Sequence, residues 1–387
     1  RTPFSRGGDG RSPLGPVLRE YLVSEFMAAV GVPTTRALAA VSTGERVVRQ
    51  MAEPGAILTR VARSHIRVGT FQFAAVRRDE AVLKALADHV IARHYPETAN
   101  ADDPYLALLE AVTARQAALV ARWMSLGFIH GVMNTDNCSI AGDTIDYGPC
   151  AFMEQFDPQK VFSSIDQGGR YAFNHQPGIA QWNQARFAET LLPLMRAEGD
   201  AAVEQATEVL RGFTARFGAE QRRLHADKLG LAPESDRAVA LMEALEIQMH
   251  QGRMDMTATF DALTHYAKTL GAQALSADTS AHSQKEALLA LTTQPAGLTA
   301  WLADWENAQQ ASQQSERQEA MRRANPVVIP RNHRIQEVID AAVEGDFAPF
   351  HTLLAAVTQP FDESAEARRL AAPATESEQV LRTFCGT

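Results

Sequence analysis

The spacing of apolar residues predicts one helix near the start of the chain. Leu18, Leu22 and Phe26 recur at helical spacing within 17–30, and a glycine and a proline follow the last turn. The segment before this helix, 5–12, is rich in glycine and charged residues, which is typical of a tight functional loop leading into a helix. The chain therefore opens with a loop and an amphipathic helix.

A second pattern, over 34–50, predicts a β-hairpin. Residues 37–42 and 46–49 are strand-like, and they flank the turn-like sequence Thr43-Gly44-Glu45. A further strand is expected at 56–61. The β-structure is thus expected in the N-terminal part of the chain.

From about residue 71 onward the pattern is almost wholly helical, with its strongest amphipathic stretch at 104–125. After Gly127 the periodicity fails over a long stretch dense in His, Asn, Asp, Gly and Pro, and such stretches are usually functional. We expect further helices near 183–196, 200–217, 218–229 and 235–250, and a loosely ordered tail at 364–380. The pattern predicts an α+β, mostly helical fold.

Composition and charge exclude several classes of protein. The 387 residues are 45% hydrophobic and carry a formal charge of −9, which fits one large domain or two and disfavours a nucleic-acid-binding surface. No apolar run approaches the roughly 18–20 residues of a membrane span, and no signal segment opens the chain. We expect neither nucleic-acid nor membrane partners, and a location in the bacterial cytoplasm or, in a eukaryote, the mitochondrial matrix.

The irregular segment 128–150 carries the candidate chemistry. It resembles the protein-kinase pattern H-R-D-L-x-x-x-N followed by D-F-G: His130 matches the His, Asn137 matches the Asn, and Asp146-Tyr147-Gly148 stands for D-F-G. Mg²⁺ prefers oxygen ligands, and a short hairpin would bring the side chains of Asn137 and Asp146 together. The spacing therefore predicts a metal clamp.

One position departs from the kinase pattern. Val132 stands where a kinase has its catalytic Asp, and valine cannot accept a proton. The nearest substitute is Asp136, which could orient or deprotonate an attacking hydroxyl. The alternative is a turn in which Asn134, Asp136 and Asn137 only bond their own backbone. The D-Y-G sequence nine residues beyond Asn137 favours the functional interpretation.

Charged residues upstream form a second candidate group. Arg60, Arg63 and Arg67 stand among apolar and small residues, an arrangement suited either to phosphate binding or to structural ion pairs. Glu20 and Glu25 lie on the first helix, where a kinase places the Glu that pairs with its phosphate-binding Lys. The alternative for a helical Glu is simple solvation.

Several blocks, in order along nearly the whole chain, resemble the selenoprotein O family. They are Phe4-Ser5-Arg6-Gly7-Gly8-Asp9-Gly10-Arg11, Gly31-Val32-Pro33-Thr34-Thr35-Arg36-Ala37-Leu38, Ser64-His65-Ile66-Arg67-Val68-Gly69-Thr70-Phe71-Gln72, the segment 130–149, Gln167-Gly168-Gly169-Arg170-Tyr171, Asn325-Pro326, Arg331-Asn332 and Cys385-Gly386-Thr387. The resemblance implies a protein-kinase-like bilobal fold: an incomplete N-lobe in 1–72, a helical C-lobe in 73–270 and a helical C-terminal extension in 271–387.

The resemblance also implies an activity and a set of site residues. ATP would bind flipped relative to ordinary kinases, and AMP would pass from ATP to Ser, Thr or Tyr hydroxyls of protein substrates. The implied roles are Asp136 as general base, Asn137 and Asp146 as ligands of Mg²⁺ (or Mn²⁺), Asp146 with Asp9 and Gly10 in the nucleotide pocket, Arg60 and Arg67 on the outer phosphates, and Glu20 as anchor of a phosphate-binding Lys. Arg63 is left as structural or solvent-facing.

Two features depart from the family pattern. The family's glycine-rich phosphate segment and its Lys lie upstream of the block that matches the start of this chain, which begins with Arg1 rather than methionine. We therefore expect an N-terminal truncation, which can leave the chain inactive alone. The resemblance also implies a redox role for the terminal Cys385, with a partner near the activation-loop-like region. Residues 158–172 hold no cysteine, and Cys150 is a poorly supported partner. With Cys138, the three cysteines predict no disulfide framework or zinc site.

Two other functions stay open on the sequence alone. A conventional ATP-dependent kinase is disfavoured by Val132, although Asp136 could serve as its base. A catalytically silent pseudokinase that binds nucleotide is favoured by the missing Lys and disfavoured by retention of Asn137 and Asp146.

Overall fold

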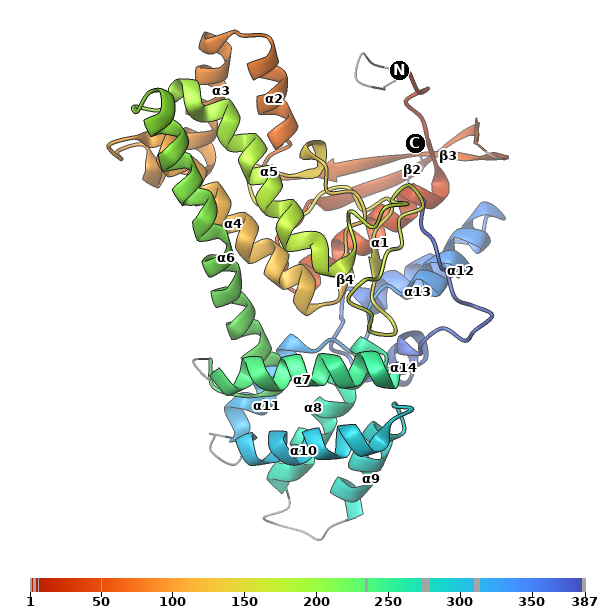
Figure 1. Ribbon diagram of the computed structural model, residues 1–387. Helices are drawn as coiled ribbons and strands as arrows, with labels where there is room; N and C mark the ends of the chain where they lie inside the picture. The colour runs from red at the N-terminus through yellow and green to blue at the C-terminus, as the bar shows by residue number, and fades with distance from the viewer. Residues whose placement is uncertain are drawn as a thin grey trace.

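The protein is mostly helical, with two small sheets (Figure 1). The computed structural model describes residues 2, 5, 7–49, 51–233, 236–272, 279–309 and 314–384. Within these ranges no helix has both the length and the apolar character to cross a membrane. The α+β class expected from the sequence is confirmed.

The N-terminal sheet packs against a single helix. Its strands β1 (Ser12–Pro13), β3 (Ala52–Val61) and β2 (Arg36–Val48) lie antiparallel in that order. The helix α1 (Leu14–Ala29) buries Leu18, Leu22 and Phe26, as its spacing predicted. Ala40 and Leu58 of the sheet pack on the same core as α1.

The hairpin turn was predicted at the wrong place. Thr43-Gly44-Glu45 lies inside β2 as a bulge, because Ser42 pairs with Ala56 and Arg46 pairs with Pro54 of the same neighbouring strand. The Thr43 hydroxyl donates to Gly55 O at 3.1 Å, which stabilises the bulge. The chain reverses instead between Val48 and Ala52.

Five helices form the next part of the molecule. They are α2 (Val68–Val76), α3 (Glu80–His94), α4 (Pro104–Ser125), α5 (Gln176–Leu191) and α6 (Gly199–Leu229), with short 3₁₀ turns at Pro96–Thr98, Thr135–Asn137, Phe173–His175 and Leu192–Leu194. The helix predicted at 104–125 is confirmed; its cap is Asp103, which accepts from Tyr105 N–H and Leu106 N–H.

The break predicted between 217 and 218 is wrong, because α6 runs through Gly218 as one helix of 31 residues. A glycine inside a helix costs only about 1 kcal/mol relative to alanine, which packing of an amphipathic face can offset. In α6 that face lies along α4, as Figure 1 shows for the two helices side by side.

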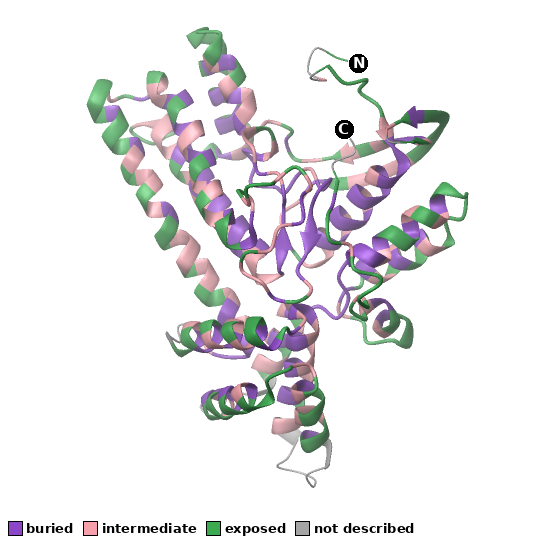
Figure 2. Ribbon diagram, turned by 45° about the vertical axis from the view of Figure 1, so that its right-hand side comes forward, coloured by how far each residue is buried: buried purple, intermediate pink, exposed green. Residues whose placement is uncertain are grey.

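The irregular stretch after α4 runs through the centre of the molecule. Its strands β4 (Phe128–Ile129) and β5 (Ala151–Phe152) pair antiparallel, so the segment between them forms a long hairpin loop. Phe128 packs against Trp123 and Phe152 with ring centroids 5.5 and 5.3 Å apart. Figure 2 shows this region as the most deeply buried part of the fold.

The C-terminal helices form two groups. The first packs around Trp301 and Trp305 and comprises α7 (Asp236–Gly252), α8 (Met256–Ala272), α9 (Thr279–Leu289), α10 (Pro295–Gln309) and α11 (Gln314–Ala324). The second comprises α12 (Asn332–Val343), α13 (Ala348–Val357) and α14 (Ala365–Ala371); α12 and α13 pack back onto α1. The division of the chain at residues 72 and 270 stays a prediction.

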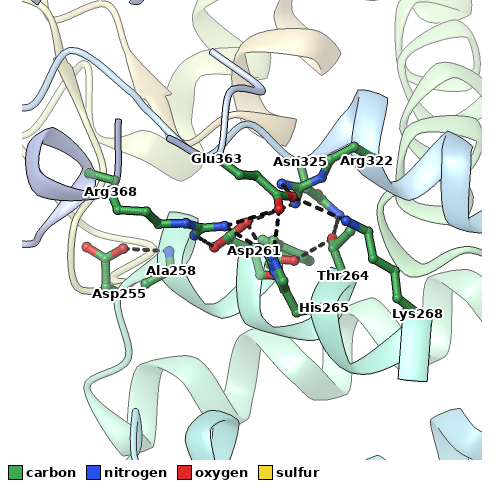
Figure 3. A network of polar contacts seen from close by, with 12 residues as sticks. Asp255, Ala258, Asp261, Thr264, His265, Lys268, Arg322, Asn325, Glu363 and Arg368 are labelled. Atoms are coloured by element: carbon green, nitrogen blue, oxygen red, sulfur yellow. Dashed lines mark hydrogen bonds and ion pairs between the residues drawn. The ribbon is translucent and has the colours of Figure 1, made fainter. Parts of the chain in front are cut away.

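A network of charges joins the two groups. Asp261 of α8 pairs with Arg322 of α11 at 2.9 Å and with Arg368 of α14, while Glu363 accepts from Lys268 at 3.2 Å (Figure 3). The expectation of a loosely ordered tail at 364–380 is therefore wrong for its first half, where Ser364 caps α14 by accepting from Ala367 N–H at 3.2 Å.

Candidate active site

His130 holds the two halves of the β4–β5 loop together. Its side chain is fully buried, its Nδ1 accepts the Val132 N–H at 3.4 Å, and its Nε2 therefore donates to Ile145 O at 3.0 Å. Burial lowers the pKa of His130, so the ring is neutral and keeps this tautomer. The residue before Asp146 is thus fixed to the start of the segment that contains Asn137.

The side chain of Asn137 is oriented by the same loop. Its Nδ2 donates to Val132 O at 3.0 Å, which leaves Oδ1 as the atom available to another partner. The Asn-x-Asp-Asn sequence does form a turn, in which Asn137 N–H bonds Asn134 O at 3.0 Å. The turn is therefore present and is compatible with the predicted role of Asn137, which stays a prediction.

Asp146 adopts an unusual backbone conformation, with φ of 71°. This left-handed region disfavours residues other than glycine, and surrounding contacts must hold Asp146 in it. The next residue supplies one contact, because Tyr147 N–H donates to Glu20 Oε2 at 2.7 Å. Glu20 also pairs with Arg60. Burial raises the pKa of Glu20, and Arg60 and the Tyr147 N–H act in the opposite direction.

Asp136 lies against the first turn of α2. A Cβ added at Gly69 would stand only 2.2 Å from Asp136 Oδ1, so the glycine makes room for the carboxylate. The two segments are joined by Val68 N–H to Cys138 O at 2.9 Å and by Ile140 N–H to Ile66 O at 3.0 Å. The N-terminus of a helix favours a negative charge, which suits a carboxylate at this position.

Arg60 and Arg67 form a cationic cluster, and His65 lies beside them. Burial and the nearby Arg60 lower the pKa of Arg67, and burial with both arginines lowers the pKa of His65. The Nε atoms of Arg60 and Arg67 are buried without a hydrogen-bond partner among the described residues. Two guanidinium groups that lie close together, each with an unused Nε donor, favour binding of a multiply charged anion at these donors.

A cavity of about 620 Å³ opens beside this cluster. It is lined by Gly10, Glu20, Arg60 and Asp146 together with apolar residues of α1 and the sheet, among them Val17 and Leu58. A mostly apolar lining with a few polar groups is typical of small-molecule sites. The structure thus brings four of the sequence-predicted residues to one cavity.

The other predicted residues lie around this cavity or elsewhere. Arg67 interacts electrostatically with both Asp136 and Asp146, and so connects the cavity with the loop that carries Asn137. Asp9 is not among the lining residues; it pairs with Arg49 at 3.0 Å, which lowers the pKa of Asp9 to about 2. Cys385 lies outside the described residues.

Comparison with known proteins decides the family. The model of the family described as protein adenylyltransferase SelO matches residues 1–358. The chain belongs to the SelO family. It is 57% identical over 390 residues to the protein nucleotidyltransferase YdiU of Rhodopseudomonas palustris (strain BisB5) and 51% identical over 389 residues to that of Agrobacterium fabrum (strain C58), and each match covers 100% of this chain and 77% of the relative. As a SelO family member the chain is a protein nucleotidyltransferase.

Not every arginine of the SelO-like segment 60–67 belongs to the site. Arg63 pairs with the buried Asp143 and lies 3.4 Å from Ala141 O, so it is structural, as the sequence suggested. Cys150, the weak candidate for a redox partner, is fully buried, and burial raises the pKa of its thiol to about 12. Such a thiol is a poor nucleophile for disulfide exchange.

The C-terminal tail reaches the site region by backbone pairing. Thr383 N–H donates to Phe162 O at 2.8 Å, Ser164 N–H donates to Thr383 O at 2.9 Å, and the Thr383 hydroxyl bonds Pro149 O. The tail therefore crosses the segment that follows the Asp146-Tyr147-Gly148 motif. Sequence reasoning placed the tail near this segment through the SelO resemblance, but had no signal for Thr383.

Sequence reasoning missed several residues that lie around this candidate site. His65 and Gly69 stand in a block that carries the resemblance, yet only the fold shows the first beside two arginines and the second beneath Asp136. Arg19 and Asn332 are 313 positions apart and meet through a hydrogen bond of 2.9 Å. No spacing rule connects residues so distant in sequence.

Proposed function

We propose that this chain transfers AMP from ATP to Ser, Thr or Tyr hydroxyls of proteins, with the terminal phosphates of ATP held by Arg60 and Arg67. The observation that carries the proposal is the pair of buried, unpartnered Nε atoms on two arginines that raise each other's electrostatic energy. Arginine donors match phosphate oxygens, and a polyphosphate would relieve the repulsion between the two guanidinium groups.

The proposal also includes a direction for ATP, which follows from the family resemblance. The outer phosphates would lie at Arg60 and Arg67, and the α-phosphate would face the acceptor hydroxyl and the carboxylates of Asp136 and Asp146. An ordinary kinase presents the γ-phosphate to its base instead. The proposal includes the flipped nucleotide and the kinase-like bilobal architecture that the family resemblance implies. Gly10 and the apolar lining residues would contribute to the nucleotide pocket, and Asp9 is not among the lining residues.

Asn137 and Asp146 are proposed to hold Mg²⁺, or Mn²⁺ in its place. Their donor atoms fit such an ion, because an amide oxygen and a carboxylate are the ligands that hard divalent cations prefer. Within the described residues no group of three or more His, Cys, Asp or Glu side chains could hold a metal, so nucleotide oxygens and water would complete the coordination. Bound there, the ion would offset the charge that develops on the phosphate oxygens.

Asp136 is proposed to act as the general base. The acceptor hydroxyl gives its proton to the Asp136 carboxylate while its oxygen bonds to the α-phosphorus, and the bond from that phosphorus to the α,β-bridging oxygen breaks. Pyrophosphate leaves with its charge against Arg60 and Arg67. Val132 is compatible with this chemistry, because Asp136 takes the role of the missing kinase Asp.

Glu20 is proposed to organise the phosphate end of the site. It contacts Arg60 through one oxygen and Tyr147 N–H through the other, so it sets the position of Arg60 relative to Asp146.

Mass spectrometry of an acceptor protein incubated with the enzyme, ATP and Mg²⁺ tests the proposal. We expect an AMP adduct on Ser, Thr or Tyr, no adduct with Asp146→Ala, and retention of the adduct with Arg63→Met. A phosphate adduct in place of AMP would refute the proposed orientation of ATP. Full activity of Asp146→Ala would refute the metal assignment.

A further inference from the structure

Two neighbouring buried charges on α1 hold the segment that begins with Asp146. Glu20 accepts the Tyr147 N–H at 2.7 Å, and Arg19 donates from Nη1 to Cys150 O at 3.2 Å. The residues that they hold lie one and four positions after Asp146. The contacts of α1 therefore fix both ends of the short segment that follows this strained residue.

Arg19 is an unusual residue at this position. It is only 7% exposed, and within the described part of the chain no carboxylate lies at ion-pair distance from it. Its other hydrogen bond goes to Asn332 Oδ1, at 2.9 Å, and Asn332 is also only 7% exposed. Desolvating a guanidinium among neutral acceptors costs free energy. Such an arginine is therefore expected where it fixes the positions of its acceptors, and less where it stabilises the fold.

Asn332 is in turn held rigidly. It is the first residue of α12, and the preceding Arg331 is 1% exposed and bonds both oxygens of Asp255, at 2.8 and 3.0 Å. Arg331 also lies 3.5 Å from Glu154, four residues after Cys150. Asp255 caps α8, where it accepts the Ala258 N–H at 2.8 Å (Figure 3). The start of α12 is thus fixed to α8 on one side and to Arg19 on the other.

We propose that Arg19 and Asn332 are positioning residues that hold Asp146 in its left-handed conformation, so that the C-terminal helix α12 controls the geometry of the metal ligand. The contacts on the Asp146 segment come from three directions: His130 before it, Glu20 beside it, and the Arg19–Asn332 pair after it. Without the pair, the segment around Gly148 and Pro149 relaxes, and Asp146 leaves a conformation that disfavours its Cβ. This inference rests on the proposed role of Asp146 as a metal ligand.

Binding of Mn²⁺ tests the inference separately from activity. The free ion is measured by electron paramagnetic resonance in the presence of the α,β-methylene analogue of ATP, which cannot release pyrophosphate. We expect Asn332→Ala and Arg19→Met to raise the dissociation constant of Mn²⁺ at least fivefold, and Arg19→Lys to raise it less. In turnover, excess Mn²⁺ should restore most of the lost rate.

A matched control separates positioning from loss of stability. Val338 lies on the same helix α12, is 2% exposed and has no part in these polar contacts, so Val338→Ala should lower the thermal midpoint and leave Mn²⁺ binding unchanged. If Asn332→Ala does not fold, Arg19→Lys provides the same comparison.

The outcomes are distinguishable. Unchanged Mn²⁺ binding in the Arg19 and Asn332 variants, with weakened binding in Asp146→Ala, overturns the positioning role and leaves the proposed function intact. Unchanged binding in Asp146→Ala overturns the metal assignment and, with it, this inference. Weakened binding in Val338→Ala equal to that in Asn332→Ala shows a general effect of stability and also overturns it.

Discussion

Arg63 and Arg67 stand four residues apart in one sequence block but have different surroundings. Arg63 reaches the buried Asp143, whereas Arg67 has an unpartnered Nε and interacts with Arg60 and the two candidate catalytic carboxylates. Both arginines lie in the connection from β3 to α2, but Arg63 stands near its start and Arg67 is its last residue, directly before the helix. Residue type alone does not separate an arginine proposed to bind phosphate from one in a structural ion pair.

The two arginines should therefore respond differently to the same substitution. Arg67→Met removes charge-assisted hydrogen bonds to phosphate, each of about 1.5–3 kcal/mol, and we expect KM for ATP to rise about 10- to 100-fold. Arg63→Met should lower the thermal midpoint, because Asp143 loses its partner, and leave KM unchanged. Steady-state kinetics with varied ATP measure both effects. An equal rise in KM for ATP in the two variants would contradict the different roles assigned to Arg63 and Arg67.

Lys228, at the end of α6, gives a prediction for the dependence of stability on pH. It is 4% exposed, contacts the Phe260 ring at 4.0 Å, and burial lowers its pKa from 10.5 to about 7. Between these values the unfolded chain binds a proton that the folded protein does not, so the free energy of unfolding rises with pH. The contribution is at most about 1.4 kcal/mol per pH unit.

Urea unfolding of wild type and Lys228→Met between pH 7 and 9 measures this contribution. The wild-type protein should gain up to about 2.7 kcal/mol over these two units, and the variant should lack that gain. Lys84→Met is the control, because Lys84 is exposed and pairs with Asp88, which raises its pKa. Equal slopes in wild type and Lys228→Met would show that the lysine is charged in the folded state.

At the scale of elements, the start of α2 is the part of the site most sensitive to a small change. Gly69→Ala adds one methyl group where Asp136 Oδ1 would lie 2.2 Å away, so the carboxylate must move. Displacing a catalytic group by about 1 Å can reduce a rate about 100-fold, and we expect kcat to fall 10- to 100-fold with little change in stability.

Gly178→Ala is the matched control for that variant. Gly178 lies in the first turn of α5, and a Cβ there would meet nothing within 4 Å. Single-turnover rates of the two variants compare the effects directly. A normal rate for Gly69→Ala would mean that Asp136 is not held against α2 or is not needed for proton transfer.

The elements also show which parts of the fold the sequence could predict. The helix at 104–125 was predictable because its apolar face and its Asp103 cap are local signals. The turn at Thr43-Gly44-Glu45 was mispredicted because a bulge uses the same residues as a turn, and only pairing with β3 distinguishes the two. The break in α6 was mispredicted because packing on α4 overrides the weak preference of one glycine.

The same distinction between local sequence signals and tertiary contacts applies to the residues of the candidate site. His130, Asn137 and the Asp146 motif could be singled out because their spacing is a linear pattern. Glu20 and Arg60 were singled out by their sequence surroundings, and the family resemblance supplied their predicted roles. The contact between Arg19 and Asn332 joins positions 313 residues apart, and the room that Gly69 gives Asp136 is a matter of packing. Both depend on tertiary structure that no linear pattern describes.

At the scale of the whole molecule, the C-terminal third contacts the elements that carry the candidate site residues. Helices α12 and α13 pack on α1, which carries both Glu20 and Arg19, and the tail residue Thr383 bonds the carbonyl of Pro149 (Figure 1). The buried centre in Figure 2 is therefore assembled from segments at both ends of the chain. Truncation of the C-terminal helices should disturb catalysis as well as folding.

The central claim is that AMP, and not phosphate, leaves ATP for a protein hydroxyl. Parallel incubations of the enzyme and an acceptor protein with α-³²P-ATP and γ-³²P-ATP test it most directly. The account predicts protein-bound label only from α-³²P-ATP. Protein-bound label from γ-³²P-ATP would contradict the flipped nucleotide and make the protein a kinase.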